Sequence, residues 1–378
     1  MDEKQVPLGY SLYLDVLRFA AAATVYFSHA GQYPFVPKGA AGAGMALLQP
    51  YGAAAVTIFF VLSGYVIAYV VATRERDLRS YAVSRISRLY SVVIPALVLT
   101  LVLDSWGSAI DPHLYAEHIV APKPITASGY VASFFLVNEF QVFGFHGIGP
   151  GSNGPWWSLS FEAAYYLLAA IALFARPRAL AIVAGLILLL ACGRTIAALA
   201  PLWALGFVLY HRREALGRAL PFPWLMWALS VAAIIALPQL IPKSPEMNFG
   251  VHFPWARQEL NRNLAEDYAV AAAVALHLVA ASRLFRDLKG IGPRTVSAIR
   301  FLGAMTFPLY AMHRPAMFFL AAINPWSNTS PVGIAVVTLV IAAGAMLVTP
   351  LCDALKTQMR RWLLHAWPAR AADVARAA

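Results

Sequence analysis

Charged residues are scarce in this chain. They make up 12% of its 378 residues, whereas 60% of the residues are hydrophobic and 12% are aromatic. A soluble domain is typically about a quarter charged, so the composition argues against a water-soluble globular protein. It argues still more strongly against disorder, because so apolar a chain has ample surface to bury.

Cysteine is nearly absent as well. The two cysteines, Cys192 and Cys352, both lie inside apolar stretches, which excludes a disulfide framework and a cysteine-based metal site. We expect both to be packing residues, and we expect no metal ion. The first ten residues also lack a short apolar core ending in a cleavage site, so the first apolar segment is predicted to be a retained membrane span.

The charge that is present is unbalanced. Lys and Arg number 29 against 18 Asp and Glu, a formal net charge of +11. Basic surfaces can bind nucleic acid, but here the charge sits in small clusters between long apolar runs. That arrangement is typical of the cytoplasmic loops of a membrane protein, so we expect lipid and not nucleic acid as a partner.

A membrane-spanning helix needs roughly 20 apolar residues, and ten stretches qualify or nearly qualify. We predict an all-α polytopic bundle of about ten transmembrane helices, near residues 11–31, 51–72, 84–104, 156–175, 179–193, 196–210, 222–241, 266–282, 301–322 and 332–352. The apolar piece 130–145 is interpreted as a half-inserted or surface segment, because counting it as a span would place the later basic clusters on alternating sides.

The positive-inside rule assigns the sides. With both termini in the cytoplasm, 21 basic residues lie inside and six outside, while Arg18 and Arg314 lie within spans. We expect one integral membrane domain over residues 1–355 and a cytoplasmic tail over 356–378. The sequence leaves the oligomeric state open, a homodimer included.

The first span carries three ionisable residues, and such residues inside a membrane mark function by default. Arg18 and His29 are eleven residues apart, so they share one helical face about 16 Å apart, with Arg18 in the inner half. Asp15 lies on the same face and could hold the Arg18 guanidinium. The competing interpretation is an internal Asp15 and Arg18 ion pair with His29 capping the helix.

Arg85 and Arg88 share a face at the cytoplasmic start of the third span. Two guanidiniums in this geometry suit phosphate groups, which they bind bidentately. The alternative is ordinary anchoring by positive charge at the inner surface.

Glu162 lies in the fourth span, about 9 Å below its outer start, at the predicted depth of His29. A carboxylate beside an imidazole fixes its tautomer and raises its basicity, as general-base catalysis requires. Tyr165 and Tyr166 follow one turn deeper and are candidate substrate-binding residues. A Glu162 buried for packing alone is the alternative.

His313 and Arg314 lie in the ninth span between Pro308 and Pro315, which loosen the helix. Either could line a substrate cavity, and Arg314 could meet a carboxylate or a lipid phosphate. An ion pair with Asp15 or with Glu162 is equally compatible with the sequence.

Together these segments resemble one family, the integral-membrane acyltransferase family 3. The motifs that carry the resemblance are LDVLR at 14–18 with the Arg18-x10-His29 spacing, FFVLSGYVI at 59–67, Arg85-x-x-Arg88, WWSLSFEAAYYL at 156–167 and LGAMTFPLYAMHRP at 302–315. Two positions depart from the family pattern. Ala163 replaces an acid or Gln after Glu162, and Arg314 replaces an aromatic residue.

The resemblance implies a bacterial inner-membrane O-acyltransferase that moves an acyl group, acetyl foremost, from cytoplasmic acyl-CoA to a carbohydrate or glycolipid outside. Arg18, Arg85 and Arg88 would then bind acyl-CoA. His29 with Glu162 would be catalytic, and the substrate-binding residues would be Asp15, Tyr165, Tyr166, His313 and Arg314. His29 could act as a general base or as an acylated nucleophile, and the acyl chain and the acceptor stay open.

A function of another class also fits the intramembrane charges. In a proton-coupled transporter or flippase, His29, Glu162 and His313 would relay protons and Arg314 would bind an anionic substrate. Against it, the sequence shows no two-fold repeat of hydropathy or motif.

Overall fold

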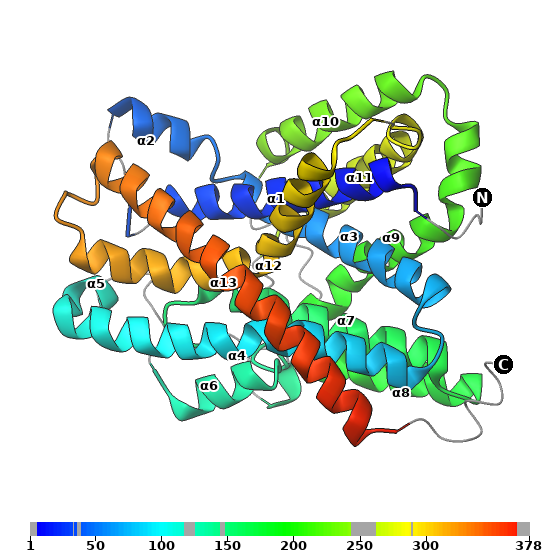
Figure 1. The fold of residues 1–378 in the computed structure, drawn as a ribbon, viewed down its shortest axis with the longest axis horizontal. Helices are drawn as coiled ribbons and strands as arrows, with labels where there is room; N and C mark the ends of the chain where they lie inside the picture. The colour runs from blue at the N-terminus through cyan, green and yellow to red at the C-terminus, as the bar shows by residue number, and fades with distance from the viewer. Residues whose placement is uncertain are drawn as a thin grey trace.

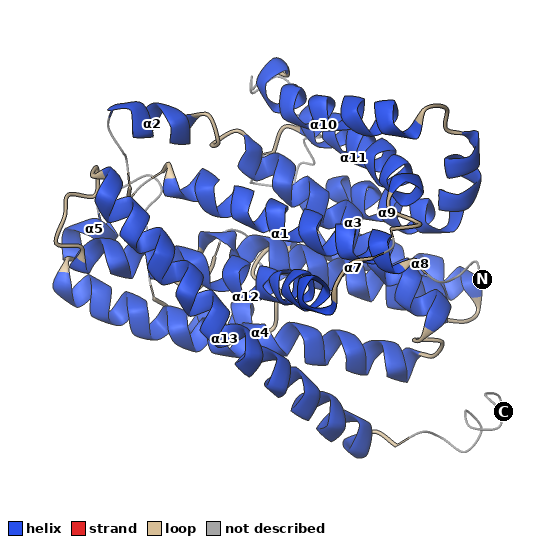
Figure 2. Cartoon of the chain, turned by 45° about the horizontal axis from the view of Figure 1, so that its top comes forward, coloured by secondary structure: helices blue, strands red, loops and turns tan. Residues whose placement is uncertain are grey.

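The computed structural model describes residues 6–32, 34–35, 39–116, 125–143, 148–242, 262–288 and 290–368. Within these ranges the chain is helical, and no strand is present (Figure 2). The α-helices are α1 (Leu8–Ala30), α2 (Gly39–Ala46), α3 (Tyr51–Thr73), α4 (Leu78–Ile110), α5 (Pro112–Ala116), α6 (Ala127–Phe134), α7 (Trp157–Phe174), α8 (Arg178–Cys192), α9 (Arg194–Ala219), α10 (Pro223–Leu240), α11 (Leu264–Leu284), α12 (Pro293–Ile323) and α13 (Pro331–Ala366). Two short 3₁₀ helices are η1 (Gln141–Phe143) and η2 (Gly154–Trp156).

Each of the ten predicted spans coincides with one helix, from α1 through α3, α4 and α7–α13. Six helical segments of the described chain are long and apolar enough to cross a membrane. They are Gly44–Thr73, Leu78–Ile110, Gly154–Phe174, Pro223–Leu240, Leu264–Leu284 and Pro331–Ala366. The chain is therefore an all-helical protein with several candidate spans, as predicted.

Close backbone packing joins α3 to α9 near the centre of the molecule (Figure 1). A Cβ on Gly64 would lie 1.9 Å from the Trp203 carbonyl oxygen, and one on Gly206 would lie 1.9 Å from that of Val61. Only glycine permits this approach, a pairing of small residues that is common between membrane helices. Around this pair, α1 and α11 pack on α3, while α12 packs on α1, α4 and α13.

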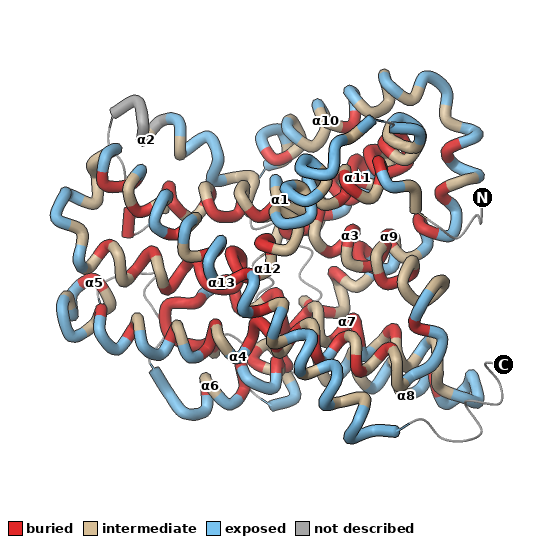
Figure 3. The backbone as a smooth tube through the Cα atoms, viewed as in Figure 1, coloured by how far each residue is buried: buried red, intermediate tan, exposed pale blue. Residues whose placement is uncertain are grey.

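Helices α8, α10 and α13 expose many of their residues (Figure 3), and large hydrophobic side chains are among the exposed ones. On α8, for example, Ile182, Leu186 and Leu190 are all more than half exposed. The buried residues concentrate instead on α1, α3, α4 and α12. A large apolar exposed surface of this kind marks a contact surface, and for these helices that contact is with lipid.

The described part of the segment 130–145 overlaps α6 and contains η1. The eight residues of α6 extend only about 12 Å, which is too short for a span, as expected of a segment that does not cross the membrane. The proposed start of a tail at 356 falls inside α13, which runs on to Ala366. Arg79 at the start of α4 donates a 2.8 Å hydrogen bond to the Leu364 carbonyl, so this end of α13 is held against the bundle.

Candidate functional site

A cavity of about 590 Å³ lies between α1, α3, α4, α7, α12 and α13. It gathers charged residues from five of these helices. Its basic residues are Arg18, Arg74, Arg85, Arg88, Arg300 and Lys356, and its acidic residues are Asp15, Glu162 and Asp353. Cations thus outnumber anions among the lining residues, and the cavity suits an anionic ligand.

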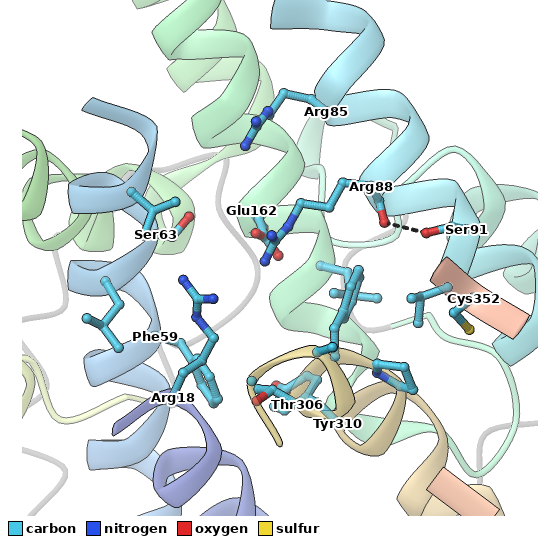
Figure 4. A pocket seen from close by; sticks show the side chains of 18 of the residues that line it. Arg18, Phe59, Ser63, Arg85, Arg88, Ser91, Glu162, Thr306, Tyr310 and Cys352 are labelled. Atoms are coloured by element: carbon cyan, nitrogen blue, oxygen red, sulfur yellow. Dashed lines mark hydrogen bonds between the residues drawn. The ribbon is translucent and has the colours of Figure 1, made fainter. Parts of the chain in front are cut away.

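Arg18 points into this cavity from α1 (Figure 4). Asp15, one turn earlier, lies 3.7 Å from its guanidinium, which confirms the predicted pairing. The same carboxylate meets Arg300 of α12 at 2.5 Å. Asp15 is therefore shared between two guanidiniums, so it is better suited to holding Arg18 in place than to contacting a substrate.

Arg85 and Arg88 both line the cavity but differ in their surroundings. Arg85 is buried, forms a 2.7 Å ion pair with Glu75 and lies 5.5 Å from the ring centre of Tyr166. Arg88 is half-buried, and the described residues give it no carboxylate partner. Of the two predicted phosphate ligands, Arg88 is thus the one whose charge is free to take a ligand.

Glu162 of α7 lines the cavity between these guanidiniums (Figure 4). Its carboxylate accepts a hydrogen bond from the Tyr166 hydroxyl and interacts electrostatically with Arg18. The expectation that Glu162 supports His29 is wrong. The neighbour of α1 at His29 is α12 and not α7, a packing choice that a sequence does not reveal.

Tyr165 does not share the position of Tyr166. Its hydroxyl donates a 3.0 Å hydrogen bond to the Ile196 carbonyl, and its ring packs against Phe60 and Phe161 in the core. Successive helical residues diverge by about 100°, so only Tyr166 faces the cavity. The prediction that Tyr165 binds substrate is corrected to a packing role.

His29 instead meets His313. Nδ1 of His29 lies 2.8 Å from Nε2 of His313, and the two ring planes are within 11° of each other. His313 is buried, and its own Nδ1 lies 2.9 Å from the Tyr310 carbonyl and 3.1 Å from that of Leu309.

When both rings are neutral, these contacts define where the protons lie. A carbonyl oxygen only accepts, so Nδ1 of a neutral His313 carries the proton and its Nε2 carries a lone pair. Nδ1 of His29 then donates to that lone pair, which leaves Nε2 of His29 unprotonated. The pair therefore presents one imidazole nitrogen that can accept a proton.

Tyr310 connects the lining of the cavity to the histidine pair. Tyr310 and Phe59 both line the cavity, and their rings meet edge to face with centroids 5.8 Å apart. The Tyr310 ring lies 6.1 Å from that of His313, and its hydroxyl is 2.7 Å from Ser158 Oγ. The cavity thus leads from Arg18 and Arg88 toward the histidines and ends one helical turn short of His313.

Arg314 is buried without a carboxylate partner in the described part of the chain. Its guanidinium lies 4.9 Å from the ring centre of Phe318, and Nη1 has no hydrogen-bond partner. Neither Asp15 nor Glu162 pairs with it, in contrast to the ion pair that the sequence allowed. A buried guanidinium without a counter-ion is costly, and such a group is poised to receive an anion.

The sequence reasoning missed several members of this site. Arg300 and Lys356 line the cavity but were assigned to anchoring clusters, and Glu75 was not considered at all. Asp104, almost fully buried near the end of α4, does not line this cavity but was also overlooked. Its position inside a long apolar run was the signal available, since an acid there needs partners.

Comparison with known proteins identifies the family of the chain. A family model described as an acyltransferase domain matches residues 11–350. The chain belongs to this acyltransferase family. It is also similar to Acyltransferase MdmB of Streptomyces mycarofaciens, with 29% identity over 152 residues, which cover 40% of this chain and 36% of that protein. The match thus spans about a third of the curated relative's length, and no solved structure matches the chain.

As a member of the acyltransferase family, the chain needs an acyl donor and an acceptor. The matched range includes the lining residues of α1, α4, α7 and α12 together with both histidines. It ends at 350, whereas Cys352, Asp353 and Lys356 also line the cavity. In the described residues, no group of three His, Cys, Asp or Glu side chains is arranged to hold a metal ion.

Proposed function

We propose that this acyltransferase moves an acyl group, acetyl foremost, from cytoplasmic acyl-CoA to a hydroxyl of a carbohydrate or glycolipid at the outer side of a bacterial inner membrane. One observation supports the proposal above others. A cavity rich in cations lies beside Arg18 on α1, and the same helix carries His29 about 16 Å further along. A donor held at one end could thus deliver its acyl group toward the other.

The cationic end of the cavity supplies a site for the donor. Arg88 and Arg74 have no carboxylate partner in the described residues, and Arg18 lies close enough to Arg88 for their charges to interact. Facing guanidiniums repel each other, so a phosphate group between them would relieve that repulsion and accept bidentate hydrogen bonds. CoA carries such phosphates, and all three arginines belong to the half of the molecule nearest the predicted cytoplasmic surface.

The histidine pair supplies the base. Nε2 of His29 would take the proton of the acceptor hydroxyl, and the freed oxygen would attack the thioester carbonyl. The carbon–sulfur bond then breaks, and the CoA thiolate leaves with the proton that His29 returns. His313 would accept the hydrogen bond from Nδ1 of His29 throughout, which fixes the tautomer and stabilises the imidazolium.

The acceptor end is proposed around Arg314, which follows His313 directly in the chain. Its unpaired guanidinium would bind a carboxylate or phosphate of the acceptor, which would place the neighbouring hydroxyl near His29. This role departs from the family pattern, where an aromatic residue occupies the position. An acylated His29 is the competing route, in which the same nitrogen attacks the thioester first.

Two measurements test the proposal. Purified protein in lipid nanodiscs, given acetyl-CoA and a cell-surface glycan extract, should release CoA thiol only when both are present. Mass spectrometry of glycans from a deletion strain should show the loss of an acyl substituent. Unchanged glycans together with no thiol release would favour the transporter interpretation.

A further inference from the structure

The loop that precedes η2 is fastened to α4 by a buried carboxylate. Oδ2 of Asp104 accepts a 2.7 Å hydrogen bond from the Ser152 backbone N–H, and Oδ1 accepts a 2.6 Å bond from the Ser152 hydroxyl. Gly151 has a φ of +55°, and a Cβ there would lie 2.0 Å from Oδ2. Glycine is thus needed both for the left-handed backbone and for the close approach of Asp104.

Asn153, the next residue, connects this loop to α12. It is 1% exposed, and its Nδ2 donates to the Ala311 carbonyl at 2.8 Å and to Thr100 Oγ1 at 3.1 Å. The Thr100 hydroxyl donates its own hydrogen bond to the Ala96 carbonyl at 2.7 Å. Both atoms that face Asn153 are therefore acceptors, which defines the orientation of its amide.

The Ala311 carbonyl needs this donor because of Pro315. In an α-helix the carbonyl of residue i accepts from the N–H of residue i+4, and proline has no N–H. Pro315 lies inside α12, so the carbonyl of Ala311 lacks the i+4 donor that a regular helix would supply. A buried carbonyl without a donor is costly, and the Asn153 amide takes the missing place.

The turn that Asn153 reaches is the turn that carries the histidine. Ala311 and Pro315 bracket His313 and Arg314, and Tyr310 of the same turn bonds to Ser158. His313 itself is placed by its bonds to the carbonyls of Leu309 and Tyr310. A shift of this turn relative to α1 would therefore move Nε2 of His313 away from His29.

We propose that Asn153 is a positioning residue of the transfer reaction. Its amide replaces the backbone donor that Pro315 lacks, and so holds the turn of α12 that presents His313 to His29. Asp104 and Thr100 anchor Asn153 from α4. The effect on catalysis rests on the proposed function, whereas the replacement of the missing backbone donor does not.

A double-mutant cycle in thermal unfolding tests the bond itself. In Pro315→Ala the helix regains its own N–H donor for the Ala311 carbonyl. Asn153→Ala should lower Tm in the wild-type background and lower it less than about half as much in the Pro315→Ala background. Equal losses in the two backgrounds would overturn the inference.

Asn138 offers a matched control for that cycle. It is also an asparagine with 1% exposure, and its Oδ1 accepts a 2.6 Å hydrogen bond from Ser160 on α7, away from α12. Asn138→Ala should lower Tm by the same amount with or without Pro315→Ala. Coupling of Asn138 to Pro315 as strong as that of Asn153 would show a general effect of the proline and overturn the assignment.

Kinetics with acetyl-CoA and the glycan extract test the positioning role. Asn153→Ala should lower kcat by about tenfold to a hundredfold, with KM for acetyl-CoA unchanged within about twofold, and Asn153→Ala/Pro315→Ala should recover part of kcat. A loss confined to KM, or no recovery, would overturn the role. If the wild-type protein transfers no acyl group, the proposed function fails, and the unfolding cycle still decides whether Asn153 serves Ala311.

Discussion

Nδ1 of His29 and Nε2 of His313 share a hydrogen bond of 2.8 Å, which joins α1 to α12. The bond directs the lone pair of His29 onto Nε2, away from His313. Because Nδ1 of His313 is committed to backbone carbonyls, the polarity of the pair is set by the backbone of α12. Reactivity at His29 should thus depend on His313.

His313→Gln and His313→Ala should show whether His313 orients the ring of His29 or only fills space beside it. Loss of the acceptor for Nδ1 of His29 frees the ring to rotate, so we expect His313→Ala to lower kcat by about tenfold to a hundredfold. Gln supplies a carbonyl oxygen that can accept from His29 and should retain more activity. Equal activity of His313→Ala and wild type in the thiol-release assay would exclude this role.

Glu162→Gln should affect binding of the acyl donor and not the basicity of His29. Glu162 contacts Tyr166 and faces Arg18 in the cavity, whereas His29 contacts His313. We expect a changed KM for acetyl-CoA and an unaltered pH profile of kcat. A shift in the pH profile of kcat would instead indicate that Glu162 interacts with His29, as the sequence suggested.

Arg85 and Arg88 should have distinct phenotypes, although both belong to one sequence motif. Arg88→Ala should weaken CoA binding by about tenfold or more, since a hydrogen bond to a charged group contributes about 1.5–3 kcal/mol, and should leave Tm nearly unchanged. Arg85→Ala should mainly lower Tm, because it strands the buried carboxylate of Glu75, a loss of about 3–5 kcal/mol.

The double variant Arg85→Ala/Glu75→Gln is the control for that pair, because it removes the stranded charge and should recover part of the lost Tm. Calorimetric titration with CoA measures binding, and thermal unfolding in detergent measures Tm. Equal CoA affinity of Arg88→Ala and wild type would show that Arg88 does not bind CoA and would favour a role in membrane anchoring alone.

Arg314→Met should stabilise the protein without substrate. Replacement of a buried charge by an apolar side chain of similar length is often neutral or stabilising by about 1–4 kcal/mol, and Arg314 has no counter-ion among the described residues. We expect a raised Tm together with reduced transfer to the glycan extract. A lowered Tm would show that Arg314 has a structural partner and would weaken its role toward the acceptor.

Much of the fold was predictable from the sequence, because hydrophobic length defines helices in a membrane. The ten apolar stretches, the pairing of Asp15 with Arg18 and the shared face of Arg85 and Arg88 all depend on spacing along one helix. Such relations follow from 3.6 residues per turn.

What the sequence could not supply was the choice of neighbouring helix. From the sequence, His29 could have met Glu162 or His313, and only the packing of α12 against α1 decides between them. The same holds for Arg300, whose contact with Asp15 brings together residues 285 positions apart. Asn153 has its proposed role only because the loop before η2 brings its amide to the Ala311 carbonyl, for which Pro315 provides no N–H donor.

The central claim is that His29 is the base of an acyl transfer, and His29→Ala tests it most directly. With purified protein in nanodiscs, acetyl-CoA and the glycan extract, thiol release by His29→Ala should fall by about 10²- to 10⁴-fold, while CoA affinity stays within about twofold of wild type. Transfer at the wild-type rate by a folded His29→Ala protein would contradict the account.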